Sequence, residues 1–246
     1  MKSIEVAVVC GLIAACQAAW ASEGDKRTPV LVELFTSEGC SSCPPADVLL
    51  ESLDHAQPVA GAEIIVLSEH VDYWNQIGWT DPFSSPRFSQ RQQAYARRFG
   101  LDGGYTPQMV VDGSTEFVGS DGRRAVSDIA EASRKTKATV RITPAGSPSR
   151  VRVEVEGAAN GEVFVAVALN EAVSQVVRGE NKGRQLRHVA VVRSLTQIGK
   201  VNGDAGFSKE IDLPADKQAD PHNYRIAVFV QERGQGRVVG AALFRP

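Results

Sequence analysis

The sequence lacks an excess of charge of either sign and lacks the motifs that mark several large enzyme classes. Its formal net charge is -2 over 246 residues, so the charge balance does not favour nucleic acid or an anionic membrane surface as a partner. A Walker loop, a G-x-S-x-G elbow and a Rossmann glycine fingerprint are all missing. The sequence therefore gives no support to a nucleotidase, a hydrolase or a dehydrogenase.

One long hydrophobic run is present, and it lies at the N-terminus. A basic residue precedes the apolar residues 6–15, and small residues follow as far as Ala21, which is typical of a secretory signal. We predict that residues 1–21 are a signal peptide, too short for a comfortable membrane span, and that the protein is periplasmic or secreted. Alternatively, residues 13–16 resemble a bacterial lipoprotein processing box, so that a lipidated Cys16 would anchor the protein to a membrane. A third possibility is that the chain is not exported.

Cysteine is scarce. Of the 4 Cys residues, Cys10 and Cys16 lie in the predicted signal, which leaves Cys40 and Cys43 in a mature soluble protein. A secreted chain that is stapled by disulfides normally has several pairs at longer spacing. The short loop between Cys40 and Cys43 also closes little chain entropy. The pair is therefore predicted to be reactive rather than structural.

The chain divides into two regions of different texture, with a boundary near Lys137. The first region, residues 22–137, alternates short β-branched runs with amphipathic segments, which predicts an α/β domain with a parallel strand pair and a hairpin. The predicted strands are 30–35, 64–67, 108–111 and 115–118, and the predicted helices are 46–55, 87–99 and 123–135.

The second region, residues 138–246, is predicted to be all-β. Period-two alternation is clear in residues 151–156, and Gly, Pro and Asn separate the apolar runs. Several short strands at this spacing favour a β-sandwich. The predicted strands are 139–143, 150–156, 163–170, 185–195, 207–212, 224–231 and 237–244.

Cys40 and Cys43 stand between a predicted strand and a predicted helix. A helix N-terminus carries about half a positive charge and favours the thiolate, which is the form that attacks a disulfide or binds a soft metal. In such a motif the first cysteine is commonly exposed and attacks, while the second is buried and resolves the mixed disulfide. We therefore expect an exposed Cys40 as the attacking thiol and Cys43 as the resolving thiol. A structural pair and a metal-binding pair are the alternatives.

The element order and a second landmark resemble a thioredoxin-type domain. In thioredoxin-like proteins a cis proline precedes the third core strand and faces the cysteine pair, and Thr106-Pro107 occupies that place here. The resemblance implies a cis bond before Pro107, which would shape the substrate groove. It also implies that the backbone of Thr106 can pair with a substrate chain.

The chain is more narrowly similar to an uncharacterised family of bacterial secreted proteins, a domain of unknown function with a thioredoxin-like fold. The residues that carry this similarity are 33–47, 70–74, 78–79 and 178–184. Membership of the family would imply a fold and a compartment, but no activity is established for the family. Compared with ordinary thioredoxins, Glu38-Gly39 replaces the usual aromatic residue, Ser-Ser separates the cysteines, and a second domain is appended.

Glu33 is an acid inside an apolar run. Thioredoxins often carry a buried acid on this strand as the proton acceptor for the second cysteine, and the resemblance implies that role for Glu33, at a spacing one residue longer. A buried carboxyl titrates upward and could exchange protons near neutral pH. Alternatively, Glu33 points to solvent at the edge of the strand.

His70, Tyr73 and Trp74 are further candidates. Ligand sites in open α/β sheets lie beyond the carboxyl ends of the strands, so His70, after the second strand, is predicted to share a rim with Cys40. His70 could stabilise a thiolate or donate a proton, and Tyr73 and Trp74 could form an apolar wall. Alternatively, these side chains only pack their loop onto the core. Together with Asp72 and the thiolates, His70 would also suit copper or zinc, although no metal ligand is assigned.

The basic segment 178–184 could bind an anion, face the first region or form a solvated hairpin. Taken together, the sequence predicts an α/β thioredoxin-like domain followed by an all-β sandwich-like domain, and an exported thiol–disulfide oxidoreductase-like protein. Its partner would be a protein or small-molecule thiol or disulfide, and no cofactor is expected. A non-catalytic ligand-binding protein and a metallochaperone-like protein on the same scaffold remain as alternatives.

Overall fold

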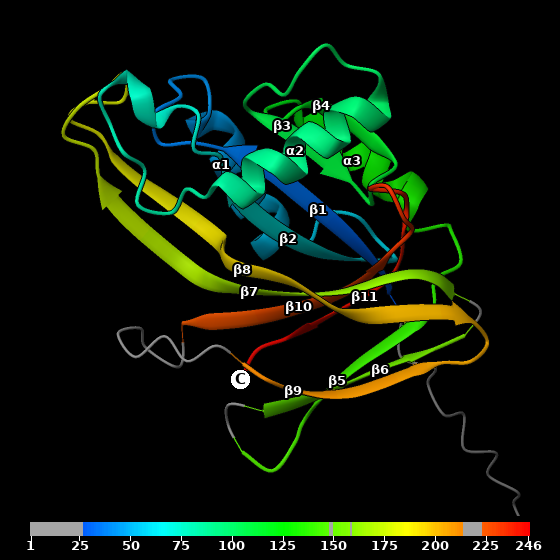
Figure 1. The fold of residues 1–246 in the computed structure, drawn as a ribbon. Helices are drawn as coiled ribbons and strands as arrows, with labels where there is room; N and C mark the ends of the chain where they lie inside the picture. Colours follow the sequence, from blue (N-terminus) through cyan, green and yellow to red (C-terminus); the bar gives the residue numbers. More distant parts are fainter. Residues whose placement is uncertain (1–26, 148–149, 158, 214–222) are drawn as a thin grey trace, which may run out of the picture.

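The computed structural model describes residues 27–147, 150–157, 159–213 and 223–246. The predicted signal peptide at residues 1–21 and Cys16 lie outside these ranges. The first half of the chain alternates strands and helices (Figure 1). In chain order these are β1 (Thr28–Thr36), α1 (Pro44–Ala56), β2 (Ala62–His70), the short 3-10 helix η1 (Asn75–Ile77), α2 (Pro86–Phe99), β3 (Gln108–Val111), β4 (Thr115–Val118) and α3 (Gly122–Ala132).

The second half is built from strands, at the positions that the sequence predicts. Two of them, β7 and β8, are longer than predicted, with 17 and 19 residues. None of the residues 171–175 of β7 is buried. This part of the strand therefore has no apolar face from which the sequence could predict it. The strands are β5 (Thr139–Pro144), β6 (Arg150–Glu156), β7 (Ala159–Gln175), β8 (Gln185–Gly203), β9 (Phe207–Asp212), β10 (Tyr224–Gln231) and β11 (Val238–Phe244).

Eight strands form one mixed sheet in the order β11-β10-β7-β8-β2-β1-β3-β4. Strands β1 and β2 are parallel, and β3 and β4 add an antiparallel hairpin next to β1, as the sequence predicts. Strand β8 runs parallel to β2, where Ser68 pairs with Val191. Strands from both sides of residue 137 therefore share one sheet.

Helices cover both faces of the first half of this sheet. Val32 and Leu34 of β1 face α1 and pack with its Leu50. Phe35 points to the opposite face and packs with Tyr95 of α2. Figure 1 shows the same arrangement, with α2 in front of β1 and β2 and α1 behind them. This alternation decides which side chains of the sheet can reach the start of α1.

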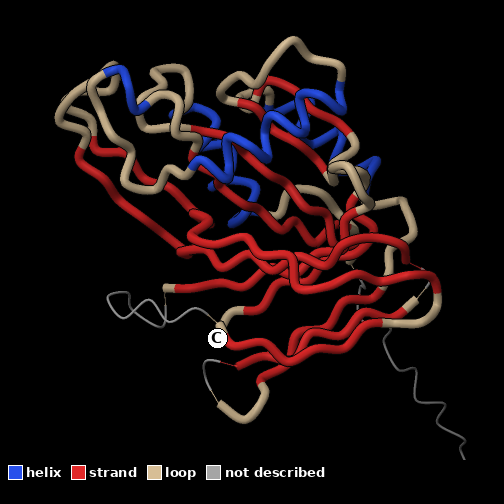
Figure 2. Tube along the Cα trace, viewed as in Figure 1, coloured by secondary structure: helices blue, strands red, loops and turns tan. Residues whose placement is uncertain are grey.

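A second sheet of three strands, in the order β5-β6-β9, covers part of the large sheet. Val151 and Val153 of β6 pack with Val165 of β7 and Val228 of β10. Figure 2 shows these two layers of strands, with the helices gathered at the other end of the molecule. The fold is thus a mixed α/β structure with one large mixed sheet and one small sheet. No helix in the described ranges is both long and apolar enough to cross a membrane.

Candidate functional site

The Cys40–Cys43 pair lies in the turn that joins β1 to α1. The Cys40 N–H donates to the Ser37 carbonyl at 3.1 Å, and the Cys43 N–H donates to the Cys40 carbonyl at 3.2 Å. The two sulfur atoms form a disulfide, with 5.4 Å between the Cα atoms. Cys43 is the N-cap of α1, and Pro44 follows at the first helical position, where a missing N–H removes no helical hydrogen bond. The disulfide therefore lies at the positive end of a helix.

Neither cysteine is exposed to solvent. Cys40 and Cys43 are both 0% exposed, so the prediction of an exposed Cys40 is wrong. The tip of the β7–β8 hairpin, the 176–184 loop, folds back against the motif. There the Asn181 Nδ2 group donates to the carbonyl oxygens of Glu38 and Cys40, both at 2.9 Å. Asn181 follows Cys40 by 141 residues, so no local pattern in the sequence indicates this cover.

The same loop places a carboxylate at the start of α1. Glu180 Oε2 accepts the Ser41 N–H at 3.0 Å, and hydrogen bonding from Ser41 lowers the pKa of Glu180. Arg184 Nη1 donates to Asn181 Oδ1 at 2.9 Å, which orients the amide so that its nitrogen faces the motif. The basic segment 178–184 thus faces the first half of the chain, which is one of the three outcomes that the sequence left open.

Trp74 and Thr106 lie beside the motif. The Trp74 Nε1 group donates to Thr106 Oγ1 at 2.8 Å. A Cβ atom on Gly39, the residue before Cys40, would lie only 3.0 Å from the Trp74 Cβ atom, so the two segments are in close contact. Tyr73 is exposed, its hydroxyl donates to Gln92 Oε1 at 3.1 Å, and burial of part of its ring raises the pKa of the phenol. Tyr73 therefore faces solvent beside α2, where its hydroxyl reaches Gln92.

Pro107 lies close to the first turn of α1. The Thr106–Pro107 peptide bond is cis, as the resemblance implied. A Cβ atom on Gly119 would lie 3.1 Å from the Pro107 Cβ atom and 3.3 Å from the Ala46 Cβ atom. Gly119 thus lies between the cis-proline segment and α1 at a point where there is no room for a side chain. Trp74 contacts Gly39, the residue before Cys40, and Gly119 lies between Pro107 and Ala46, which follows Cys43 by three residues.

His70 ends β2 and is fully buried. Its Nδ1 atom lies 2.7 Å from Asp81 Oδ2, and its ring packs edge-on against the ring of His188 with 4.7 Å between centroids. His188, on β8, lies between two carboxylates, with Nε2 3.3 Å from Glu38 Oε1 and Nδ1 3.7 Å from Asp47 Oδ1. We call His70, Asp81, His188, Glu38 and Asp47 the histidine cluster.

The histidine cluster adjoins the cysteine turn. Glu38 precedes Cys40 by two residues, and Asp47 follows Cys43 by one helical turn, so both carboxylates belong to the segment that carries the disulfide. Trp79 Nε1 donates to Glu38 Oε2 at 2.7 Å, which links this tryptophan to the cluster. The Glu38 N–H also donates to Asp81 Oδ2 at 2.9 Å, so Asp81 connects His70 to the segment that carries the disulfide.

The cluster holds buried charge. Burial alone would lower the pKa of His188, but the carboxylates of Asp47 and Glu38 outweigh it and raise this pKa to about 10. His188 is therefore a cation at neutral pH. Burial alone would raise the pKa of Asp81, but His70 and backbone N–H groups lower it below its usual value. Glu38 Oε1 and Asp47 Oδ1 make no hydrogen bond to the described residues, so the cation beside them is their main compensation.

Sequence reasoning assigned no role to four residues of the histidine cluster, namely Glu38, Asp47, Asp81 and His188. Glu38 was treated only as a departure from the usual aromatic residue, although it is an acidic residue only two positions before Cys40. Asp47 stands four residues after Cys43, which places both side chains on one face of the helix. His188 comes from the distant strand β8 and Asp81 from the loop before α2, and no local pattern pairs either of them with the cysteine segment. Asn181 lies in the segment 178–184, for which the sequence left contact with the first region open.

Glu33 is not brought to the cysteine pair. It is 0% exposed, so the solvent-edge alternative is wrong, and it faces α2 rather than α1. Its Oε1 atom lies 2.6 Å from Arg91 Nε, and its Oε2 atom accepts the Tyr95 hydroxyl at 2.5 Å. Burial and the neighbouring Glu33 raise the pKa of Glu69, which lies 3.5 Å from Arg91. Glu33 is a partner of a buried cation, on the face of the sheet opposite to α1.

Replacement of Glu33 by glutamine is expected to lower the free energy of unfolding by about 1–3 kcal/mol, because a buried charged hydrogen bond to Arg91 is lost. This decrease in the free energy of unfolding is smaller than for a buried cation without any partner, because Glu69 remains near Arg91. Urea denaturation measures the change, with the exposed Glu63→Gln on β2 as the control. A reactivity of the cysteine pair that changes in Glu33→Gln would contradict the placement of Glu33 outside the site.

The structure does not group His70, Asp72 and the two cysteines as the metal ligands that the sequence suggested. Asp72 accepts a hydrogen bond from Ser89 Oγ at 2.5 Å, and the two thiols are bonded to each other. Across the described ranges, no group of three or more His, Cys, Asp or Glu side chains is placed to hold a metal ion.

Fold and site together define a mixed α/β protein with a Cys-x-x-Cys disulfide at the start of a helix. The chain belongs to the family described as a protein of unknown function, DUF1223, whose model matches residues 31–231. The crystal structure of protein AGR_C_4864 from Agrobacterium tumefaciens is similar, with a TM-score of 0.72, 28% identity, and coverage of 89% of this chain and 95% of that chain. A domain of the outer membrane lipoprotein Omp28 from Porphyromonas gingivalis gives a TM-score of 0.27 and 14% identity over 45% of this chain and 88% of that chain. No curated protein matches the chain.

Proposed function

We propose that this protein is a thiol–disulfide oxidoreductase on a thioredoxin-like fold, acting on a protein or small-molecule thiol or disulfide. The observation that carries the proposal is the Cys40–Cys43 disulfide at the N-terminus of α1, beside the cis peptide bond before Pro107. The strand order β2-β1-β3-β4, with a parallel pair and an antiparallel hairpin, supports the thioredoxin-like assignment.

The proposed reaction is a pair of thiol–disulfide exchanges. A thiolate of a dithiol substrate attacks the Cys40 sulfur, forms a mixed disulfide and releases Cys43 as a thiolate, which takes up a proton. The second substrate thiol then attacks the substrate sulfur of the mixed disulfide and releases Cys40. The substrate leaves as a disulfide, and the protein gains two electrons and two protons. The reverse sequence reduces a substrate disulfide, with Cys40 as the attacking thiolate at the positive end of α1.

Exchange requires movement of the 176–184 loop. Cys40 is fully buried, and Asn181 and Glu180 hold the loop against the motif. A substrate thiol has to approach the Cys40 sulfur along the disulfide axis, so the closed form is unreactive. We propose that opening of this loop exposes the pair and makes room for a substrate next to Thr106 and Tyr73.

The proposed activity is tested by equilibrating the folded protein in glutathione redox buffers and trapping free thiols by alkylation. The expected result is reversible two-electron reduction with a potential within roughly -270 to -120 mV. Cys43→Ser should accumulate a mixed disulfide with glutathione at Cys40, whereas Cys40→Ser should accumulate much less. In the reduced protein, Cys40 should react with the alkylating reagent at pH values well below 8.5, the approximate pKa of a free thiol. A pair that stays oxidised in folded protein under strong reductant would show a structural disulfide.

One observation favours the alternative of a non-catalytic ligand-binding protein on this scaffold, namely the complete burial of Cys40. The same redox titration separates the two functions, because a binding protein needs no exchange at the pair. The metallochaperone-like alternative predicts tight binding of Cu⁺ or Zn²⁺ by the reduced protein, which metal analysis after reduction measures directly.

We further propose that the protein works outside the cytoplasm, in the periplasm or the medium. The support is the apolar N-terminal run that ends near Ala21, together with a disulfide pair that suits an oxidising compartment. The mass of the protein isolated from cells separates cleavage after Ala21 from lipidation at Cys16.

A further inference from the structure

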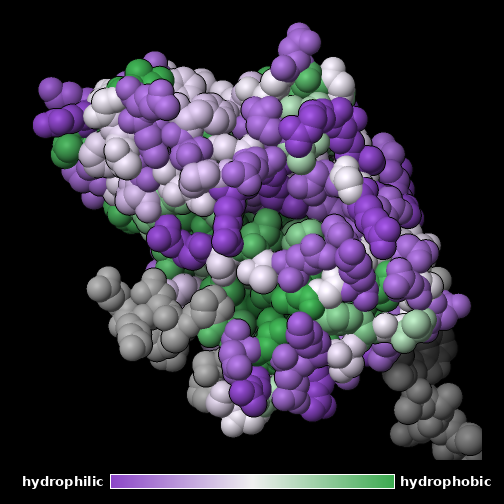
Figure 3. Space-filling model, viewed as in Figure 1, coloured by the Kyte–Doolittle hydropathy of each residue, from purple (hydrophilic) through white to green (hydrophobic). Residues whose placement is uncertain are grey.

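A second candidate site lies on the face of the large sheet that α2 covers, whereas the cysteine pair begins α1 on the other face. A groove of about 640 Å³ lies between α2 and the strands β7 and β8, with Gly234 and Gln235 of the β10–β11 turn at one end. Figure 3 shows apolar surface recessed beside the polar ridge that α2 forms. Its volume lies within the roughly 300–1,000 Å³ of typical small-molecule sites.

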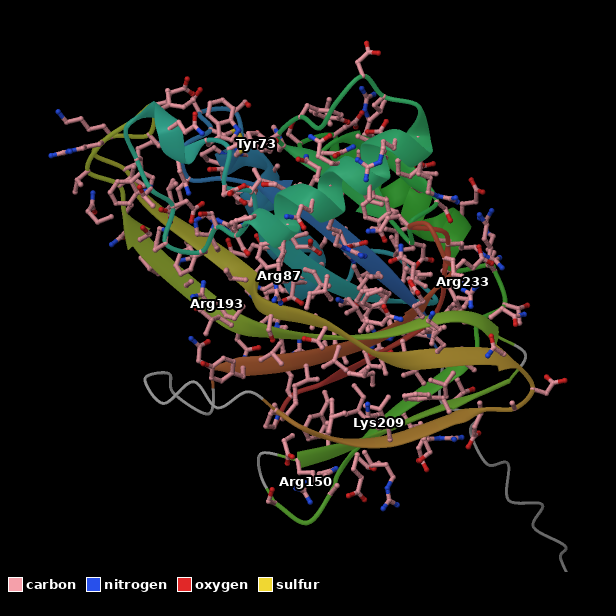
Figure 4. The ribbon with its side chains drawn as sticks, in the orientation of Figure 1. Tyr73, Arg87, Arg150, Arg193, Lys209 and Arg233 are labelled. Carbon is pink, nitrogen blue, oxygen red and sulfur yellow. A yellow bond between two sulfur atoms is a disulfide. The ribbon has the colours of Figure 1, made fainter. Side chains whose placement is uncertain are left out.

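The groove has a strongly basic rim. Helix α2 carries the arginines Arg87, Arg91, Arg97 and Arg98 and no acidic residue. Arg91 is buried and paired with Glu33. The other three are exposed, and their side chains form no ion pair with any residue in the described ranges. Figure 4 shows Arg87 between the first turn of α2 and β8. Three guanidinium groups thus line the groove without a counter-charge.

The acidic residue on the opposite wall does not neutralise this rim. Glu162 of β7 lies 3.8 Å from Lys200 Nζ and accepts a hydrogen bond from Gln197 Nε2 at 3.2 Å. It is therefore engaged with β8, the strand next to it in the sheet. The net charge around the groove stays positive, and a ligand that enters gains from carrying negative charge.

The floor of the groove is apolar and well supported. It consists of Phe88 of α2, Phe164 of β7 and Leu195 of β8. The ring of Phe164 stacks on Phe229 with 5.3 Å between centroids, and the Arg91 guanidinium lies 5.8 Å from its centre. Phe164 and Leu195 are each only partly buried, so they leave apolar surface for a ligand to cover.

We propose that this groove binds a small free carboxylate with an apolar tail, such as a medium-chain fatty acid. The tail covers the apolar surface that Phe164 and Leu195 leave open, and the carboxylate accepts charge-assisted hydrogen bonds from Arg97, Arg98 or Arg87. An inorganic anion would leave the floor uncovered, and a neutral hydrocarbon would leave the arginines without a partner. The site is independent of the thiol–disulfide function, because it lies on the α2 face of the sheet.

Isothermal titration calorimetry of the protein with decanoate tests this site. Arg98→Glu is expected to weaken binding about tenfold or more, because it replaces an attractive charge by a repulsive one. The matched control is Arg123→Glu on α3, an exposed arginine outside the groove, which should change the affinity by less than about twofold. Both residues are exposed, so neither substitution is expected to disturb the fold.

Three outcomes would overturn the proposal. Binding of decyltrimethylammonium, which has the same tail and a positive head, as tightly as decanoate would show a purely apolar surface. Arg98→Glu and Arg123→Glu could weaken binding equally, which would show only an effect of net charge. Absence of decanoate binding up to millimolar concentration, with binding to phosphatidylglycerol vesicles, would show a membrane surface instead of a small-molecule site.

Discussion

Replacement of Asn181 by alanine is expected to increase the rate at which dithiothreitol reduces the Cys40–Cys43 disulfide by about tenfold to thirtyfold. The Asn181 amide donates two buried hydrogen bonds to the cysteine segment, and a typical hydrogen bond contributes about 1 kcal/mol net. Loss of both shifts the opening equilibrium of the 176–184 loop by about 2 kcal/mol, and each 1.4 kcal/mol is a factor of about ten. Because Cys40 is fully covered in the closed form, the observed rate follows the open population.

The measurement is the rate of thiol appearance under excess dithiothreitol, followed by alkylation and mass spectrometry. Lys182→Ala is the matched control, because Lys182 is an exposed residue next to Asn181 in the same loop. Urea denaturation of both variants separates local opening from a general loss of stability. If Asn181→Ala is reduced no faster than wild type while its free energy of unfolding falls, then the loop does not control access to the pair.

The fold was predictable where each strand has one buried face. In β6, residues 150–156 alternate between exposed and buried along their whole length, and the predicted bounds agree with the observed ones. In β1, by contrast, both faces are covered by helices, and Glu33 sits in a run that reads as apolar. Its partner Arg91 lies 58 residues away, so the sequence shows an acid in a strand without showing the cation that stabilises it there.

The site was predictable only in part, for a related physical reason. Cys40 and Cys43 belong to a recognisable local pattern and are bonded to each other in the structure, and Pro107 follows the cis peptide bond that the resemblance implied. The loop that covers the pair and the cation His188 both come from the β7–β8 hairpin, which joins the sheet beside β2. The hydrophobic periodicity predicted that hairpin as part of a separate region. Periodicity carries no information on where the tip of a hairpin packs. The exposed Cys40 was therefore predicted from the first region alone.

Replacement of His188 by glutamine is expected to give the largest change in stability, and the change should depend on pH. In the folded protein the carboxylates of Asp47 and Glu38 outweigh the cost of burial and raise the pKa of His188 from 6.5 to about 10, a net difference of roughly 4–5 kcal/mol in favour of the charged imidazole. A group whose folded pKa is raised contributes its full stability below its unfolded pKa and loses it as pH rises through the folded value. The difference in free energy of unfolding between wild type and His188→Gln, called the gap below, should therefore be largest near pH 6 and disappear towards pH 10.

Urea denaturation at a series of pH values from about 6 to 10 measures this gap. His55→Gln is the matched control, since His55 is largely exposed on α1 and lies 3.9 Å from Asp54, and it should change stability by less than about 0.5 kcal/mol. The physical reason for the large effect is that glutamine leaves Glu38 and Asp47 buried without a cation. A gap that is constant across this range would mean that His188 acts by packing alone. A gap that closes as expected would show that His188 is charged at neutral pH, between the two carboxylates that belong to the segment carrying the disulfide.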